Sequence, residues 1–126
     1  MTDIKGAVVL VTGGGRGLGK ALVTEALARG ASKVYATARD PRAIAARPGV
    51  VPLALEVTDA DSVAALTERV PDLTVLINNA GVARSASYLT GDLADIRTDV
   101  ETNFYGPLLL TRALARRSWP TVVGIW

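Results

Sequence analysis

A glycine-rich stretch, Thr12 to Gly19 (TGGGRGLG), has the residue types of a turn that binds phosphate. Glycines let the backbone turn tightly and approach a phosphate, and the free N–H groups and positive dipole end of a following helix stabilise its charge. A turn that only closes a strand–helix unit is the alternative, but the strand and amphipathic helix on either side favour nucleotide binding. The expected cofactor-binding residues here are Thr12, Gly13, Gly15, Arg16, Gly17, Leu18 and Gly19.

Arg39 lies about twenty residues beyond the glycines, where a dinucleotide fold normally places an acidic residue on the ribose 2′-hydroxyl of NAD. A guanidinium there would instead hold the 2′-phosphate of NADP, and Arg16 could assist from the glycine turn. The alternative is that Arg39 is an ordinary exposed charge and Asp40 binds the ribose. The sequence therefore favours NADP as the cofactor, with NAD as the alternative.

The composition excludes several other chemistries. The chain has no Cys, so it has no disulfide and no thiolate nucleophile. It also has no His, which is the commonest general base and metal ligand, so we expect no metal site. The 14 basic and 12 acidic residues are spread along the chain, which argues against a nucleic-acid partner. No run approaches the roughly 20 apolar residues of a membrane span, and no secretory signal pattern opens the sequence. A cytoplasmic protein with no membrane partner is the expectation.

The elements that must position these residues alternate along a chain of 126 residues, a length that fits one domain. The expected strands are apolar runs at 7–12, 33–37, 51–57 and 73–77, with a fifth candidate at 121–126 beside the fourth. The expected helices begin at Leu18, at about Thr58 and at about Asp92, with a weak one at 41–46. Such alternation predicts an α/β fold with a parallel sheet covered on both faces, whose ligand lies at the carboxyl ends of the strands.

Finer patterns predict how the helices begin, end and pack. Leu18, Leu22 and Ala26 form the expected buried stripe of the first helix, which Gly30 ends. Thr58 and Asp61 have capping-box spacing before a face of Val63, Leu66 and Val70. Leu93, Ile96, Val100 and Phe104 form the apolar face of the helix at about 92–117, which Gly106–Pro107 is expected to kink.

Two more motifs make the interpretation specific: NNAG at 78–81, directly after the fourth strand, and Asn103 within TNFYGP. With TGGGRGLG, they resemble the short-chain dehydrogenase/reductase family over about residues 5–115. The resemblance implies a Rossmann-like doubly wound parallel sheet, truncated after about four or five strands. Residues 1–126 would then form one NAD(P)-binding domain with an atypical tail at about 116–126.

The resemblance also implies roles for individual residues. Gly13, Gly17 and Gly19 would form the pyrophosphate turn, and Asn79, Ala80 and Gly81 would line the cofactor. Asn103 would be an accessory catalytic residue that helps hold a proton-relay water; an Asn that only caps or kinks a helix is the alternative. Glu56 and Val57 occupy the place of an Asp-Val pair near adenine, and the longer carboxylate could accept the same hydrogen bond.

The family's proton-transfer pair, a Tyr with a Lys four residues later, is absent. The residues four positions after Tyr35, Tyr88 and Tyr105 are Arg39, Asp92 and Leu109, and Ser118 precedes the expected fifth strand. The resemblance thus implies an NADP-dependent oxidoreductase acting on a carbonyl or alcohol, represented by a chain expected to be inactive alone. The alternatives are a non-catalytic NADP-binding subunit and a truncated or frameshifted fragment, because codon degeneracy allows a family-like continuation from about Arg116 in another frame.

An open sheet edge and the exposed apolar face of the last long helix predict self-association. In the family this helix belongs to a common subunit interface. The resemblance therefore implies a homodimer through the helix at about 92–117.

Overall fold

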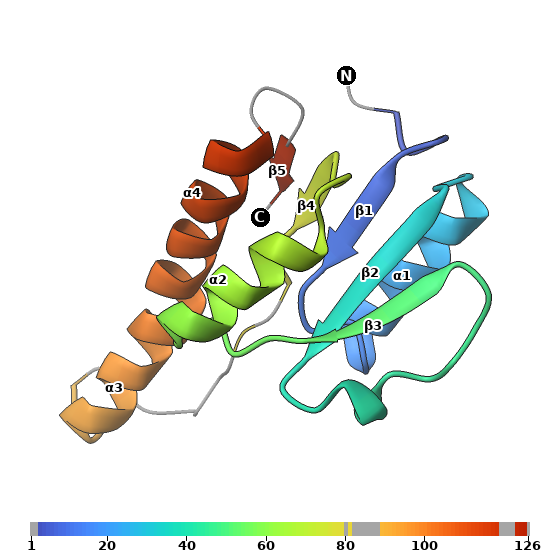
Figure 1. The fold of residues 1–126 in the computed structure, drawn as a ribbon. Coiled ribbons are helices and arrows are strands. Elements are labelled where there is room, and N and C mark those ends of the chain that lie inside the picture. The colour runs from blue at the N-terminus through green and yellow to red at the C-terminus, as the bar shows by residue number, and fades with distance from the viewer. Residues whose placement is uncertain (1–2, 80, 82–88, 119–122, 126) are drawn as a thin grey trace.

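The computed structural model of the chain describes residues 3–79, 81, 89–118 and 123–125. Its centre is a five-stranded sheet in the order β3-β2-β1-β4-β5, in which every pairing is parallel (Figure 1). The strands are β1 (Val8–Val11), β2 (Lys33–Ala38), β3 (Val50–Ala54), β4 (Val75–Ile77) and β5 (Val123–Ile125). The predicted α/β doubly wound sheet is confirmed, and the described part of the fifth candidate strand pairs with β4 as expected.

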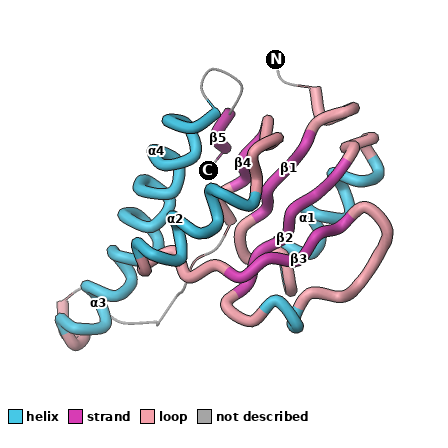
Figure 2. The backbone as a smooth tube through the Cα atoms, viewed as in Figure 1, coloured by secondary structure: helices cyan, strands magenta, loops and turns pink. Residues whose placement is uncertain are grey.

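In the part of the chain that the structure describes, four α-helices and two short helical turns connect and cover the strands. The helices are α1 (Gly17–Ala28), α2 (Ala60–Arg69), α3 (Leu93–Val100) and α4 (Gly106–Ser118). A 3-10 turn at Pro41–Ala43 replaces the longer helix expected at 41–46, and a π-helical turn spans Glu101–Tyr105. Figure 2 shows α1 on one side of the sheet and α2 and α4 on the other. Among the described residues, no helix is long and apolar enough to cross a bilayer.

The continuous apolar runs of the strands divide into two cores, because successive side chains point to opposite faces of the sheet. Val9 and Val11 pack with Val23 and Ala26 of α1. Leu10 between them points the other way, into the core that α2 and α4 complete. Burial on both faces explains why β1 lacks the alternation of a half-exposed strand.

The first helix buries part of the stripe that was expected: Ala26 is buried, and Leu22 is partly buried against the same core. Gly19, Val23 and Ala26 are the buried residues of α1, whereas Leu18 is 69% exposed, so its predicted place in the buried stripe is wrong. The helix begins against the glycine turn, and the close approach there needs a residue without a side chain. Its end was predicted correctly, because Gly30 follows with φ of 90°.

The second helix has the predicted buried face but another cap. Val63, Leu66 and Val70 are all buried, as expected. Asp59, not Thr58, is the N-cap: its carboxylate accepts hydrogen bonds from the backbone N–H groups of Asp61 and Ser62 at 2.9 and 3.4 Å. The Thr58 hydroxyl instead donates to Glu56 Oε1 at 2.9 Å.

The third strand ends at Ala54, three residues before the expected end at Val57. The Leu55 N–H still reaches Ala38 O of β2 at 2.9 Å, but the Glu56 N–H turns to Ser62 Oγ at 2.9 Å. The chain therefore leaves the sheet at Glu56 and bends toward α2.

The irregularity expected at Gly106–Pro107 takes the form of the π-helical turn just before it. Pro107 has no N–H to donate to the carbonyl of the preceding turn, and the Gly106 N–H reaches back five residues to Glu101 O. A Cβ on Gly106 would lie 2.9 Å from Val57 Cγ2, so this glycine lets α4 approach the loop after β3.

A polar cluster joins β2 to the loop after α2 at the amino ends of the strands. Lys33 Nζ lies 2.5 Å from Asp72 Oδ2, and the Tyr35 hydroxyl donates to Asp72 Oδ1 at 2.7 Å. Partial burial raises the pKa of the Asp72 carboxyl, but the hydrogen bonds from Lys33 and Tyr35 outweigh it and leave this pKa below its usual value. The Asp72 carboxylate, with help from Tyr35, raises the pKa of Lys33.

These two pKa shifts predict how the cluster stabilises the fold across pH. The stability from Asp72, whose folded pKa is lowered, is present above its unfolded pKa of 3.8 and is lost as pH falls through the folded value. The stability from Lys33, whose folded pKa is raised, is present below 10.5 and is lost as pH rises through the folded value. Asp72→Asn should therefore lower the free energy of unfolding by about 1 kcal/mol near pH 7.

Urea unfolding of both proteins from pH 7 to 3 measures this difference, which should shrink as pH falls below about 3.8. Tyr35→Phe removes one hydroxyl donor and keeps the ion pair, so it should show a weaker form of the same dependence. A difference between wild type and Asp72→Asn that is constant over this range would contradict the assigned cause.

Candidate nucleotide-binding cleft

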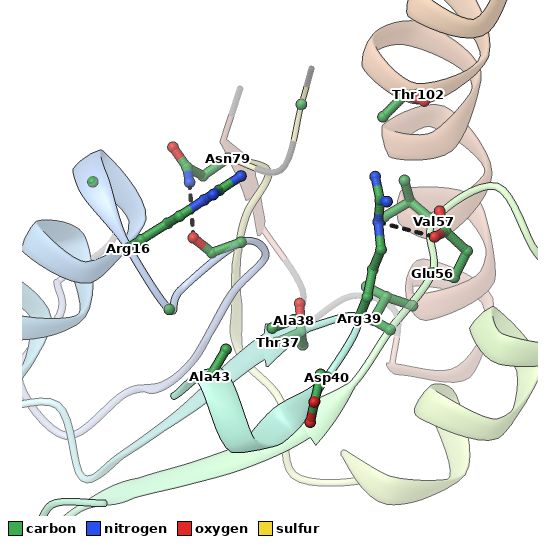
Figure 3. Close-up of a pocket in the computed structure, with 15 residues that line it drawn as sticks. Arg16, Thr37, Ala38, Arg39, Asp40, Ala43, Glu56, Val57, Asn79 and Thr102 are labelled. Carbon is green, nitrogen blue, oxygen red and sulfur yellow. Dashed lines mark hydrogen bonds and ion pairs between the residues drawn. The ribbon is translucent and has the colours of Figure 1, made fainter. Parts of the chain in front are cut away.

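A cleft of about 760 Å³ opens at the carboxyl ends of β1 to β4 (Figure 3). Strand β1 has β2 on one side and β4 on the other. The chain adds β2 and β3 on one side of β1 and then β4 and β5 on the other, so the strand order reverses at β1. Ligands of open α/β sheets bind at such a reversal. The lining residues are Gly13, Gly15, Arg16, Gly17, Thr37, Ala38, Arg39, Asp40, Ala43, Leu55, Glu56, Val57, Asn79, Gly81 and Thr102.

The glycine turn forms one wall of the cleft and depends on the absence of side chains. Gly13 and Gly17 have φ of 66° and 56°, in the left-handed region that favours glycine. A Cβ on Gly19 would lie 1.9 Å from Gly13 O, a separation that no side chain can occupy. The turn therefore packs against the first turn of α1, whose N–H groups are suited to an anionic group.

Two polar side chains fix this turn to the end of β4. The buried Thr12 hydroxyl accepts a hydrogen bond from the Asn79 N–H at 2.9 Å. The Asn79 carboxamide in turn donates through Nδ2 to Gly13 O at 3.3 Å. Thr12 thus acts behind the cleft wall, whereas Asn79 both braces the turn and lines the cleft.

Arg39 and Glu56 form an ion pair at the opposite wall, with Arg39 Nε 3.1 Å from Glu56 Oε2. Figure 3 shows Arg39 rising from the end of β2 beside Glu56, while Arg16 extends into the cleft from the glycine turn. The two cations expected to bind phosphate thus border one cleft from different sides. The sequence predicted both as ligands but did not predict the pairing of Arg39 with Glu56.

Asp40, the alternative ribose ligand, is already engaged by its neighbour. Its carboxylate accepts hydrogen bonds from the Arg42 N–H, Nε and Nη2 at 2.9 to 3.2 Å. These bonds hold the pKa of the Asp40 carboxyl below its usual value. Figure 3 shows this side chain pointing away from Arg39. The geometry disfavours Asp40 as the group that binds a ribose hydroxyl.

The structure brings Gly81 and Asn103 together. A Cβ on Gly81 would lie 2.8 Å from Asn103 Oδ1, so a larger residue would collide with the carboxamide. Asn103 lies in the π-helical turn, and the neighbouring Thr102 lines the cleft. Ala80, also expected at the cofactor, lies outside the described residues.

Several lining residues were not predicted, and four of the predicted residues that the structure describes do not line the cleft: Thr12, Leu18, Gly19 and Asn103. Thr37, Ala38, Ala43, Leu55 and Thr102 were missed. The first two end β2, so the rule that ligands lie at the carboxyl ends of strands could have identified them. Of the predicted residues, Leu18 faces solvent and Gly19 packs behind the glycine turn. Val57 lines the cleft as expected.

Three features define an α/β protein of the Rossmann-like class: the parallel sheet, the glycine turn at a helix N-terminus, and the cleft at the point where the strand order reverses. The model of the short chain dehydrogenase family matches residues 7–120. The chain therefore belongs to the short-chain dehydrogenase/reductase family. The matched span begins close to residue 5, as expected, and extends beyond Ala115 to residue 120.

Individual relatives agree with this assignment. The short chain dehydrogenase gsfK of Penicillium aethiopicum is 34% identical over 122 residues, which cover 86% of this chain and 49% of that protein. A short chain dehydrogenase from Burkholderia cenocepacia J2315, solved in complex with NADP, is 36% identical with a TM-score of 0.91. The match covers 98% of this chain and 54% of the Burkholderia protein.

An NADPH-bound carbonyl reductase from chicken fatty liver is similar at 35% identity and a TM-score of 0.77, covering 90% of this chain and 48% of that protein. The chain thus spans about half the length of each of these three proteins.

Proposed function

We propose that this chain is the NADP-binding part of an oxidoreductase that transfers a hydride between NADP(H) and a carbonyl or alcohol. The observation that carries the proposal is a cleft with a glycine turn that excludes side chains on one wall, where Arg16 extends into the cleft, and Arg39 on the opposite wall. The NADP and NADPH complexes of the Burkholderia and chicken proteins support the choice of cofactor. A bound nicotinamide cofactor would supply or accept the hydride.

The residues of this chain would bind and orient that cofactor. The N–H groups at the start of α1 would bind the pyrophosphate, with Gly13 and Gly17 giving it close access to the backbone. Arg39 would bind the 2′-phosphate through the terminal nitrogens of its guanidinium. Asn79, Gly81 and Thr102 would line one end of the cleft, called the inner end below.

Asn103 would act at this inner end as an accessory group of the proton path, close to Gly81. We expect the purified chain to be inactive by itself, since none of its tyrosines has a Lys four residues later. Saturable NADPH binding without turnover on a panel of carbonyl compounds would favour the non-catalytic alternative.

The preference for NADP predicts a selective effect of Arg39→Ala. We expect isothermal titration to show NADPH binding the wild-type chain more tightly than NADH. Arg39→Ala should weaken NADPH binding by about tenfold, which is the lower end for a charge-assisted hydrogen bond, and should change NADH binding less than about twofold. Equal affinity of the wild type for both cofactors would contradict the preference.

Arg29→Ala is the matched control for this substitution. Arg29 is also exposed and forms an ion pair, with Glu25 at 2.8 Å, but it lies at the end of α1 and does not line the cleft. We expect no change in the affinity for either cofactor. A similar loss in both arginine variants would indicate a general effect of charge.

Self-association through the last helices is a further part of the proposal. Its support is an exposed apolar surface formed by Leu93, Val100, Phe104, Tyr105 and Leu109. None of the residues of α3 is buried, so this helix has little contact with the rest of the described chain. A second copy would remove that surface from water.

A further inference from the structure

The carboxylate of Glu56 is fixed beside the side chain that is proposed to bind the 2′-phosphate. Its Oε1 accepts a hydrogen bond from the Thr58 hydroxyl at 2.9 Å, and its Oε2 lies 3.1 Å from Arg39 Nε. The backbone is held as well, because the Glu56 N–H donates to Ser62 Oγ at 2.9 Å. Glu56 is thus anchored, whereas the Arg39 side chain is 70% exposed and is accessible to a ligand.

The ion pair uses one edge of the guanidinium. Figure 3 shows Glu56 beside Arg39 Nε, with the two terminal nitrogens directed away from the carboxylate. A phosphate could therefore bind the terminal nitrogens, but it would lie close to the negative charge of Glu56. The same carboxylate would then both orient Arg39 and repel its ligand.

Magnitudes decide which of these two effects is larger. At roughly 6 Å, repulsion between two unit charges weakens binding by about threefold at a dielectric constant of about 80 and by about a hundredfold at about 20. A dianionic phosphate is repelled more strongly, and salt reduces the effect. An exposed ion pair contributes about fivefold at most to the population of one side-chain position. Repulsion should therefore exceed orientation.

We propose that Glu56 is a specificity-determining residue that weakens binding of a 2′-phosphorylated adenosine group by holding Arg39 in an ion pair. This inference rests on the proposed NADP site. It assigns to Glu56 an effect on the phosphate, in addition to the hydrogen bond to adenine that the family resemblance implies. The chain discriminates between NADPH and NADH less than Arg39 alone would allow.

Isothermal titration with adenosine 2′,5′-bisphosphate and with 5′-AMP tests this inference on the adenosine side of the cleft alone. Glu56→Gln keeps the length of the side chain and an acceptor for Thr58 but removes the charge. Both ligands carry adenine, so an altered contact with that base cancels in the ratio of their affinities. We expect Glu56→Gln to tighten bisphosphate binding relative to AMP binding by about three- to tenfold, and to lose this gain as salt is raised.

Glu56→Ala separates repulsion from orientation, because it removes the contact with Arg39 as well as the charge. It should also tighten bisphosphate binding relative to AMP, whereas weaker binding would show that orientation dominates and would overturn the proposal. Glu25→Gln is the matched control: it breaks the exposed pair with Arg29 outside the cleft and should change neither ligand. Thermal melting followed by circular dichroism verifies that each variant is folded.

Equal changes for the two ligands, or no preference for the bisphosphate in any variant, would also overturn the role of Glu56. If the wild-type chain binds neither NADPH nor NADH, that is a different result, which would contradict the proposed function.

Discussion

Gly19→Ala should abolish measurable NADPH binding and lower the free energy of unfolding by about 3 kcal/mol or more, the upper end for an overpacked site. The added methyl group would lie 1.9 Å from Gly13 O and 2.6 Å from Asn79 Nδ2, so the glycine turn must move away from α1. Alanine favours a helix over glycine by only about 1 kcal/mol, which does not compensate for this collision. Isothermal titration and urea unfolding measure the two effects.

Gly6→Ala is the control that separates loss of the site from loss of stability. Gly6 also has a positive φ, 76°, but a Cβ there meets nothing within 4 Å, and the residue does not line the cleft. This variant should be less stable than wild type by about 1 kcal/mol and should bind NADPH with unchanged affinity. NADPH binding by Gly19→Ala at the wild-type affinity would show that the turn is not where the cofactor binds.

Leu110→Ala should lower the free energy of unfolding by about 2 to 5 kcal/mol through the cavity that it leaves. Leu110 is fully buried and joins α4 to the core that α2 and the sheet share. A loss of this size is a large part of the roughly 5 to 15 kcal/mol that stabilises a domain. Urea unfolding measures it as a lower midpoint with an unchanged slope.

The adjacent residue provides a matched control on the same helix. Leu109 is 53% exposed, so Leu109→Ala should change the free energy of unfolding by less than about 1 kcal/mol. Equal losses in the two variants would contradict the position of α4 against the sheet.

The strands were predictable because a strand buried on both faces leaves a continuous apolar run, as in β1. Helix faces were harder where the buried residue has no side chain. Gly19 packs against the glycine turn but adds nothing to hydrophobic periodicity, so the periodicity predicts Leu18 as the buried residue. Thr58 and Asp59 are both good N-cap residues, and only the path of the backbone decides between them.

The site was predictable where a short motif gives both the residue type and its position relative to a strand or helix. Gly13, Gly17 and Asn79 are of this kind: Gly13 and Asn79 closely follow β1 and β4, and Gly17 begins α1. The pairing of Arg39 with Glu56 has no local signal. It depends on the register of β2 and β3, whose last residues Ala38 and Ala54 lie opposite each other, with the two charged residues just beyond these strand ends. Such a contact needs the sheet to be known first.

The order of the strands also determines when the cleft can be completed during folding. The contact of Ser32 with Ala7 beside β1 and β2 joins residues 25 positions apart, whereas Thr74 reaches Val8 across 66. The longer loop closes at a greater entropic cost, so we expect β4 to join an earlier β1–β2 unit. Asn79 would then reach Thr12 and Gly13 late, and a chain emerging from the ribosome would gain its nucleotide affinity only after β4 has docked.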